Sequence, residues 1–145
     1  MGIATGSEDG KIRVWDLSKW KCAKILNTNS GPVTSLLQIK NTQELVSSTR
    51  SGIKLWNFKS GQCVKSLFTG PVESLLLLPY TGHLVTGGSD GTLKVWLLTA
   101  NNSKRNKYNY MEHHQHYVIK EHDHSVNSLQ FIAKSPSYDA CKVID

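Results

Sequence analysis

Short runs of alternating apolar and polar residues recur along the chain, and polar turns separate them. In residues 11–15 (KIRVW), Ile12 and Val14 point to one side of an extended chain, and the residues between and after them point to the other. The dipeptide Asp9-Gly10 stands directly before this run, and such dipeptides favour hairpin turns because glycine tolerates positive φ. No stretch shows the 3.6-residue period that marks an amphipathic helix. The pattern therefore predicts an all-β chain of short antiparallel strands.

The pattern is repeated along the chain. Trp15, Trp56 and Trp96 each close a strand-like run, and successive tryptophans lie 41 and 40 residues apart. Cys22 and Cys63 each follow their tryptophan by seven residues. Each unit holds four short strand-like runs. Four antiparallel strands in a repeat of this length describe one blade of a β-propeller.

The repeated segments resemble WD40 repeats. Residues 6–17 (GSEDGKIRVWDL) and 87–98 (GGSDGTLKVWLL) are similar to the turn and third strand of a blade in that family. The resemblance covers nearly the whole chain apart from a segment after Thr99. It implies a partial propeller over residues 1–145, with blade parts at residues 1–28, 29–68, 69–122 and 123–145.

The resemblance also implies an incomplete ring. The units are expected to hold three, four, four and two strands, which amounts to about three and a quarter blades, whereas WD40 propellers that close have about seven. Both ends of the chain are then expected to leave unpaired strand edges with apolar faces. The chain is interpreted as a piece of a longer propeller protein, or as one that self-associates or has its ring completed by another chain.

Blades of the family contain a buried hydrogen-bonded tetrad of a His, a Ser or Thr in the first strand, an Asp in the turn and the strand Trp. The second repeat has no Asp in its turn, so Trp56 is expected to lack its acceptor chain and the blade to be the least rigid. In the first and third repeats, the turn carboxylates are expected to make buried hydrogen bonds. The resemblance implies the following tetrad remnants: Asp9, Trp15, Ser35, Trp56, Ser74, Asp90, Trp96, His122 and Ser128.

An insertion over residues 99–116 is expected as a mobile loop between a third and a fourth strand, with the fourth strand resuming at residues 117–122. Its basic residues Lys104, Arg105 and Lys107 lie beside tyrosines, an arrangement that can hold phosphates and stack on bases. This loop carries the alternative function of nucleic-acid or phosphoinositide binding. Its histidines are not interpreted as a metal site, because no cysteine lies nearby.

Composition adds few constraints. The formal net charge of +6 is a moderate excess that identifies no ligand. Three cysteines without a C-x-x-C pair favour neither a disulfide framework nor a zinc site, and Cys22 and Cys63 are expected to be small buried residues. No apolar run reaches the length of a membrane span, and no secretory signal is present, so an intracellular protein is expected.

The sequence contains no nucleophile elbow, phosphate-binding glycine loop or zinc-protease helix. No catalytic residue, cofactor or metal ligand is therefore assigned, and the protein is not expected to be an enzyme. The leading interpretation is a protein–protein interaction scaffold, whose partners are other proteins. Family members bind partners mainly on one face of the ring, which implies contacts at Glu8, Arg50 and Ser89.

Overall fold

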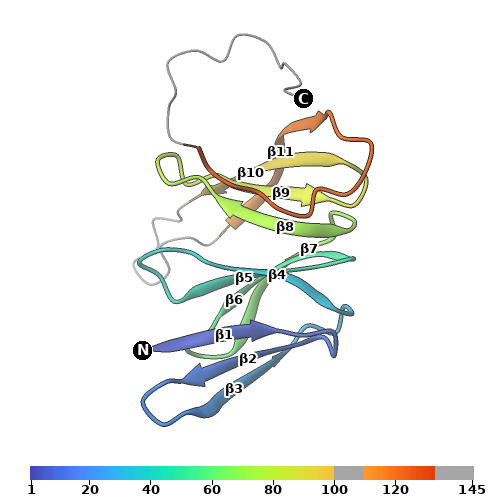
Figure 1. Cartoon of the computed structure of the whole chain (residues 1–145). Coiled ribbons are helices and arrows are strands. Elements are labelled where there is room, and N and C mark those ends of the chain that lie inside the picture. The colour runs from blue at the N-terminus through green and yellow to red at the C-terminus, as the bar shows by residue number, and fades with distance from the viewer. Residues whose placement is uncertain (100–109, 133–145) are drawn as a thin grey trace.

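The computed structural model describes residues 1–99 and 110–132, and all the regular secondary structure in them is β-strand (Figure 1). The expected all-β class is thus confirmed. Three antiparallel sheets follow one another along the chain and form the first, second and third blades. The strands are β1 (Gly2–Gly6), β2 (Lys11–Asp16) and β3 (Lys21–Asn27); β4 (Val33–Gln38), β5 (Glu44–Thr49), β6 (Gly52–Asn57) and β7 (Gln62–Leu67); and β8 (Val72–Leu77), β9 (Leu84–Gly88), β10 (Thr92–Thr99) and β11 (Tyr110–Lys120).

The three tryptophans occupy equivalent positions, as the repeat predicts. Trp15 pairs across the ladder with Ile3, and the corresponding pairs are Trp56 with Leu45 and Trp96 with Leu84. In every blade the ladder between the third and fourth strands is also irregular directly before the tryptophan. The 40-residue period of the sequence therefore corresponds to a repeated register in the structure.

Each indole N–H donates to a hydroxyl of the neighbouring second strand. Trp15 donates to Thr5 Oγ1 at 2.9 Å, Trp56 to Ser47 Oγ at 2.9 Å, and Trp96 to Thr86 Oγ1 at 3.1 Å. This corrects two expectations. The acceptor belongs to the second strand rather than the first, and Trp56 has a buried acceptor although its blade lacks the turn Asp.

Apolar side chains fill the seams between blades. Ile12 and Leu26 of the first blade pack with Leu45 and Trp56 of the second. The seam between the second and third blades is a larger cluster, formed mainly by Ile39, Val46, Ile53, Leu55, Leu67, Val72, Leu84 and Trp96. The tryptophan-bearing faces of the second and third blades are therefore each covered by the preceding blade.

Lysines of the third strands add polar links across the same seams. Lys54 Nζ of β6 donates to the carbonyl oxygen of Thr28, at the end of the first blade. Lys94 Nζ of β10 donates to the carbonyl oxygen of Thr69, at the end of the second, over 2.8 Å. Because both lysines precede their tryptophan by two residues, the repeat itself encodes this contact.

The expected loop over residues 99–116 is partly strand. β10 and β11 stay paired out to Thr99 and Tyr110, so residues 110–116 belong to a long hairpin. Two register irregularities, on either side of Trp96, interrupt this ladder. The fourth strand expected at residues 117–122 is present over residues 117–120, which pair with residues 92–95. Residues 100–109, with Lys104, Arg105 and Lys107, lie outside the described residues.

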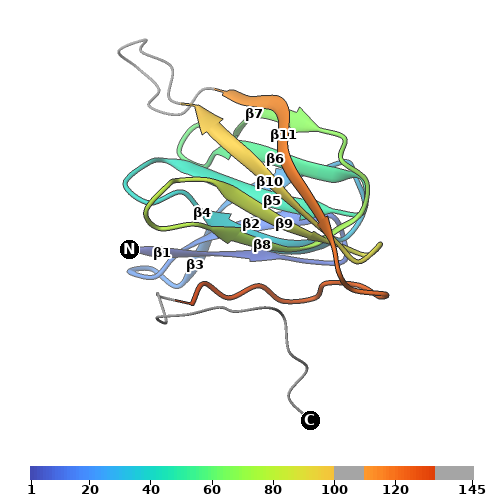
Figure 2. The same ribbon diagram turned by 90° about the horizontal axis from the view of Figure 1, so that it is seen from above.

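Residues 121–132 run along the third blade without forming a ladder (Figure 2). Val126 N donates to the carbonyl oxygen of Gly88 at 3.0 Å, and Ser74 Oγ donates to the carbonyl oxygen of Val126 at 2.8 Å. Val33, at the start of the second blade, makes the corresponding backbone bond to Ser7 O at 3.1 Å. This segment therefore contacts the blade before it as the first strand of another blade does. The rest of the expected fourth blade lies outside the described residues.

We predict that Ser47→Ala lowers the free energy of unfolding by about 1–3 kcal/mol, because it leaves the buried Trp56 N–H without an acceptor. Thr5→Ala is the matched control. It removes the same type of bond at an exposed position, where water replaces the hydroxyl, and should cost no more than about 0.5 kcal/mol. Urea denaturation followed by tryptophan fluorescence measures both changes. Equal losses in the two variants would contradict the expected role of burial.

Candidate functional site

The turns between second and third strands gather at one end of the three blades. They lie at residues 7–10, 50–51 and 89–91, on the right in Figure 1. The connections that leave each fourth strand reach the same end, because the strands of a blade run up and down in turn. Backbone bonds join the two sets, for example Thr28 N to Gly10 O at 3.0 Å. We call this surface the turn face.

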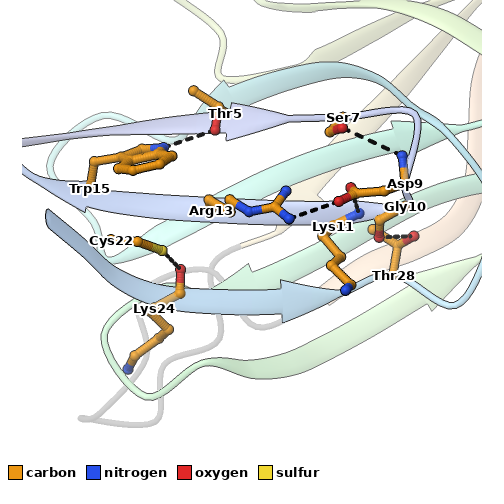
Figure 3. Close-up of polar contacts among 10 residues, drawn as sticks. All are labelled: Thr5, Ser7, Asp9, Gly10, Lys11, Arg13, Trp15, Cys22, Lys24 and Thr28. Carbon is orange, nitrogen blue, oxygen red and sulfur yellow. Dashed lines mark hydrogen bonds and ion pairs between the residues drawn. The ribbon is translucent and has the colours of Figure 1, made fainter.

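A carboxylate closes the turn of the first blade. Lys11 N donates to Asp9 Oδ1 at 3.0 Å, and the Arg13 guanidinium donates to Asp9 Oδ2 at 2.8 Å (Figure 3). The Arg13 hydrogen bond is the main reason why the pKa of Asp9 falls to about 2. Asp9 is exposed, which corrects the expectation of a buried hydrogen bond to this carboxylate.

The third blade repeats this turn. Asp90 Oδ1 accepts from Thr92 Oγ1 at 2.6 Å and from Thr92 N at 3.1 Å, and the bond from the hydroxyl is the main cause of the lowered pKa of Asp90. Asp90 is also exposed. Gly10 and Gly91 follow the two carboxylates with φ of +73° and +80°, a conformation that glycine adopts without steric cost.

The turn of the second blade is built without a carboxylate. Thr49 takes its place: Ser51 N donates to Thr49 Oγ1 at 3.2 Å, and that hydroxyl donates to Gly52 O at 3.3 Å. Arg50 projects from this turn and is exposed. No residue of the described part of the chain accepts a hydrogen bond from its guanidinium or forms an ion pair with it.

Of the three expected contact positions, Glu8 and Arg50 are exposed, and Ser89 is half-buried. They lie at corresponding places in successive turns. The Ser89 carbonyl oxygen accepts from Ser125 Oγ at 3.3 Å, which ties this turn to the segment after β11. Acidic groups stand in the turns of the first and third blades, whereas the second presents a cation.

The turn face also holds an exposed aromatic side chain that the sequence analysis did not predict as a contact residue. Phe68 follows β7 and is 85 % exposed. Beside it, Ser51 and Gly52 of the Arg50 turn help to line a shallow depression. The signal in the sequence was an apolar residue between a strand and the turn residues Thr-Gly-Pro, at a place where the first repeat carries the polar Asn27.

Other residues expected in tetrads are dispersed. His122 and Ser128 are exposed, Ser35 is half-buried, and Ser74 is buried against Val126. The structure therefore gives the first-strand serines no bond to an indole N–H. Cys22 and Cys63 are exposed free thiols on the outermost strands of their blades, which corrects the expectation that they are buried.

A groove of about 550 Å³ lies between the first and second blades. The open edge of β1 forms one side, and Leu36, Leu37 and Phe58 form part of the other. Its lining side chains are almost all apolar, and none is an acid or a base, so they supply no group for acid–base catalysis. Among the described residues, no three His, Cys, Asp or Glu side chains cluster as metal ligands do.

Comparison with known proteins agrees with this architecture. A sequence model of the family described as "WD domain, G-beta repeat" matches residues 2–16 and 61–96. This match and the three repeated blades show that the chain contains WD40 repeats. In the described part of the chain, no helix is long and apolar enough to cross a membrane.

The chain is also similar to proteins named eukaryotic translation initiation factor 3 subunit I. Identity is 30% over 143 residues with the protein of Culex quinquefasciatus. It is 27% over 143 residues with that of Anopheles gambiae and 28% over 146 residues with that of Drosophila ananassae. Each match covers 94% of this chain and 43–44% of the relative, so the chain spans less than half of the length of these proteins.

At the end of the molecule opposite the turn face, one carboxylate is buried. Glu44 begins β5 and is only 6 % exposed, and no described residue bonds to its Oε2 atom. Burial raises the pKa of Glu44, because the charged form loses its hydration. The folded chain therefore favours the protonated form more strongly than the unfolded chain does.

We predict that Glu44→Gln stabilises the fold at pH 7 by about 1 kcal/mol, because it removes an unpaired buried charge. The raised pKa makes the contribution of Glu44 most favourable below its unfolded pKa, and this contribution is lost as pH rises through the folded pKa. The difference between variant and wild type should therefore shrink as pH falls towards 4. Urea titrations across this range, with exposed Glu8→Gln as control, measure it. A Gln variant less stable than wild type at pH 7 would show that the carboxylate is paired.

Proposed function

We propose that the protein is a non-catalytic, protein-binding subunit of translation initiation factor 3. The observation that carries the proposal is similarity over 94% of the chain to proteins named as subunit I of that factor. The fold supports it, because packed blades hold the exposed turns in fixed relative positions and so make a rigid surface for recognition. This role places the protein inside the cell, with the translation machinery.

A binding role agrees with the chemistry of the turn face. Asp9 and Asp90 accept hydrogen bonds within their turns, and Lys54 and Lys94 donate to backbone carbonyl oxygens. These four charged groups therefore stabilise the fold. The turn face presents its other exposed side chains, which lie in ordered turns, to a partner. Such a surface suits contact with another protein better than proton transfer, which needs an acid and a base brought together.

We predict that affinity purification of the tagged full chain from its own cells recovers other subunits of initiation factor 3, identified by mass spectrometry. Glu8→Lys, on the turn face, should lower this recovery because it reverses a charge at the expected contact surface. Lys40→Glu, an exposed charge reversal in the turn after β4, should not. Recovery no greater than that of an unrelated WD40 protein would contradict the proposed function. Equal recovery with both variants would exclude Glu8 from the interface.

The outer face of the first blade exposes apolar side chains that no described blade covers. Ile3 is 51 % exposed, whereas its counterparts Leu45 and Leu84 are buried by the preceding blade. Trp15 is half-buried, while Trp56 and Trp96 are buried. We propose that another blade covers this face, from the same protein or from another chain, because burying apolar area is favourable by about 25 cal/mol per Å².

This proposal predicts that the purified chain self-associates with rising concentration, as measured by static light scattering. Ile3→Lys should shift it towards the monomer, because a charge on the open face opposes burial. Tyr80→Ser, which removes an exposed aromatic group from the turn between β8 and β9, is the control. A wild-type chain that stays monomeric at every concentration tested would contradict the proposal.

A further inference from the structure

We infer that the second blade carries a recognition site for an anionic side chain next to an apolar one on a partner peptide, formed by Arg50 and Phe68. The inference rests on the proposed protein-binding function and names the chemistry of the bound segment. Carboxylate and phosphate share the required geometry, since each presents oxygens in pairs that match the donors of a guanidinium.

Arg50 is a basic group of the turn face that makes no hydrogen bond or ion pair to the described residues. Arg13 pairs with Asp9, Lys54 donates to Thr28 O and Lys94 donates to Thr69 O. Among the described residues, by contrast, nothing accepts a hydrogen bond from the Arg50 side chain. Its five N–H donors therefore face water and are available to an anion.

Phe68 supplies an apolar surface that folding does not require. In the ladders between third and fourth strands, Leu67 pairs with Ile53 as Leu26 does with Ile12, so Phe68 and Asn27 follow at equivalent places. Asn27 shows that a polar residue suits this position. Because Phe68 is 85 % exposed, its ring adds little to the core. Exposed aromatic residues of this kind often anchor protein interfaces.

The two residues belong to segments that touch. A Cβ atom placed on Gly52 would collide with Leu67 O and Thr69 N, so the Arg50 turn lies against the backbone on both sides of Phe68. Ser51, Gly52 and Phe68 line one shallow depression. Adjacent side chains of an extended peptide can therefore meet the guanidinium and the ring together.

The neighbouring turns restrict the choice of peptide. Glu8 and Asp9 stand in the turn of the first blade, and Asp90 stands in that of the third. Like charges placed close together repel, so a peptide with a long acidic run is disfavoured, while one acidic residue opposite Arg50 is accepted. The site therefore selects a single anion beside an apolar residue. The second blade is covered on both faces by its neighbours, so this arrangement is complete within the described chain.

The test uses the full chain and a set of synthetic peptides that differ at one position. Each carries Glu, phosphoserine, Gln or Ser next to a leucine in an otherwise neutral sequence, and binding is measured by fluorescence anisotropy. The Glu or phosphoserine peptide should bind at least about fivefold more tightly than its neutral twin. Tighter binding of phosphoserine identifies phosphate as the preferred group, and tighter binding of Glu identifies carboxylate.

Variants separate the site from general charge attraction. Arg50→Glu should abolish the preference for the anionic peptide, whereas Lys59→Glu, which changes net charge equally at an exposed position, should keep it. Phe68→Ala should weaken binding of the leucine peptides, and Tyr80→Ala, at an equally exposed aromatic residue, should not. Because all four residues have exposed or polar side chains at turns, the variants should fold, which circular dichroism checks.

Three results would overturn the inference: neutral peptides that bind as well as anionic ones, equal loss with Arg50→Glu and Lys59→Glu, or no effect of Phe68→Ala. The outcome is distinct from that of the proposed function. If subunits of the factor are recovered but the peptides show no dependence on Arg50, the site fails and the function stands. If the peptides behave as expected but no subunits are recovered, the assignment to the factor fails and the site stands.

Discussion

The rest of the structure depends on one interaction, the packing of the Trp56 and Trp96 faces against the preceding blade. An indole ring buries a large apolar area, but its N–H must keep a hydrogen-bond partner once water is excluded. Ser47 and Thr86 meet this need from the adjacent strand, while the rings pack into the seams. The hydroxyl thus joins the ladder within a blade to the packing between blades, and it ties the second and third strands to one register.

Register in turn sets the position of the turn face. Once Trp56 is opposite Leu45 and Trp96 opposite Leu84, the turns that join these strands must project at the same end. Lys54 and Lys94 then link each third strand to the end of the preceding blade, close to that end. The contacts between blades therefore fix the distances between the exposed residues of successive turns.

The repeated features of the fold could be predicted from the sequence, because a period, a hairpin glycine and a tryptophan are local signals. The all-β class and the equivalence of Trp15, Trp56 and Trp96 follow from them. The residue that accepts the indole hydrogen bond could not be predicted, because each repeat holds several hydroxyl residues. Only the ladder register places Ser47, and not Ser35, beside Trp56. The proximity of Phe68 to the Arg50 turn could not be predicted from the sequence either, because it depends on how the strands pair and on the path of the chain after β7. The exposure of Cys22 and Cys63 depends on their place on outer strands, which apolar character alone does not reveal.

The missing turn Asp of the second repeat illustrates how a departure from the repeat changes the chemistry of the surface. In the first blade, Asp9 closes the turn and also pairs with Arg13, so a carboxylate there neutralises a nearby cation. In the second blade, Thr49 closes the turn with a neutral hydroxyl. Turn closure is thereby preserved, and Trp56 keeps its own acceptor in Ser47, so the core does not depend on the carboxylate. What the substitution removes is the negative charge of this turn, and among the described residues no acid pairs with Arg50.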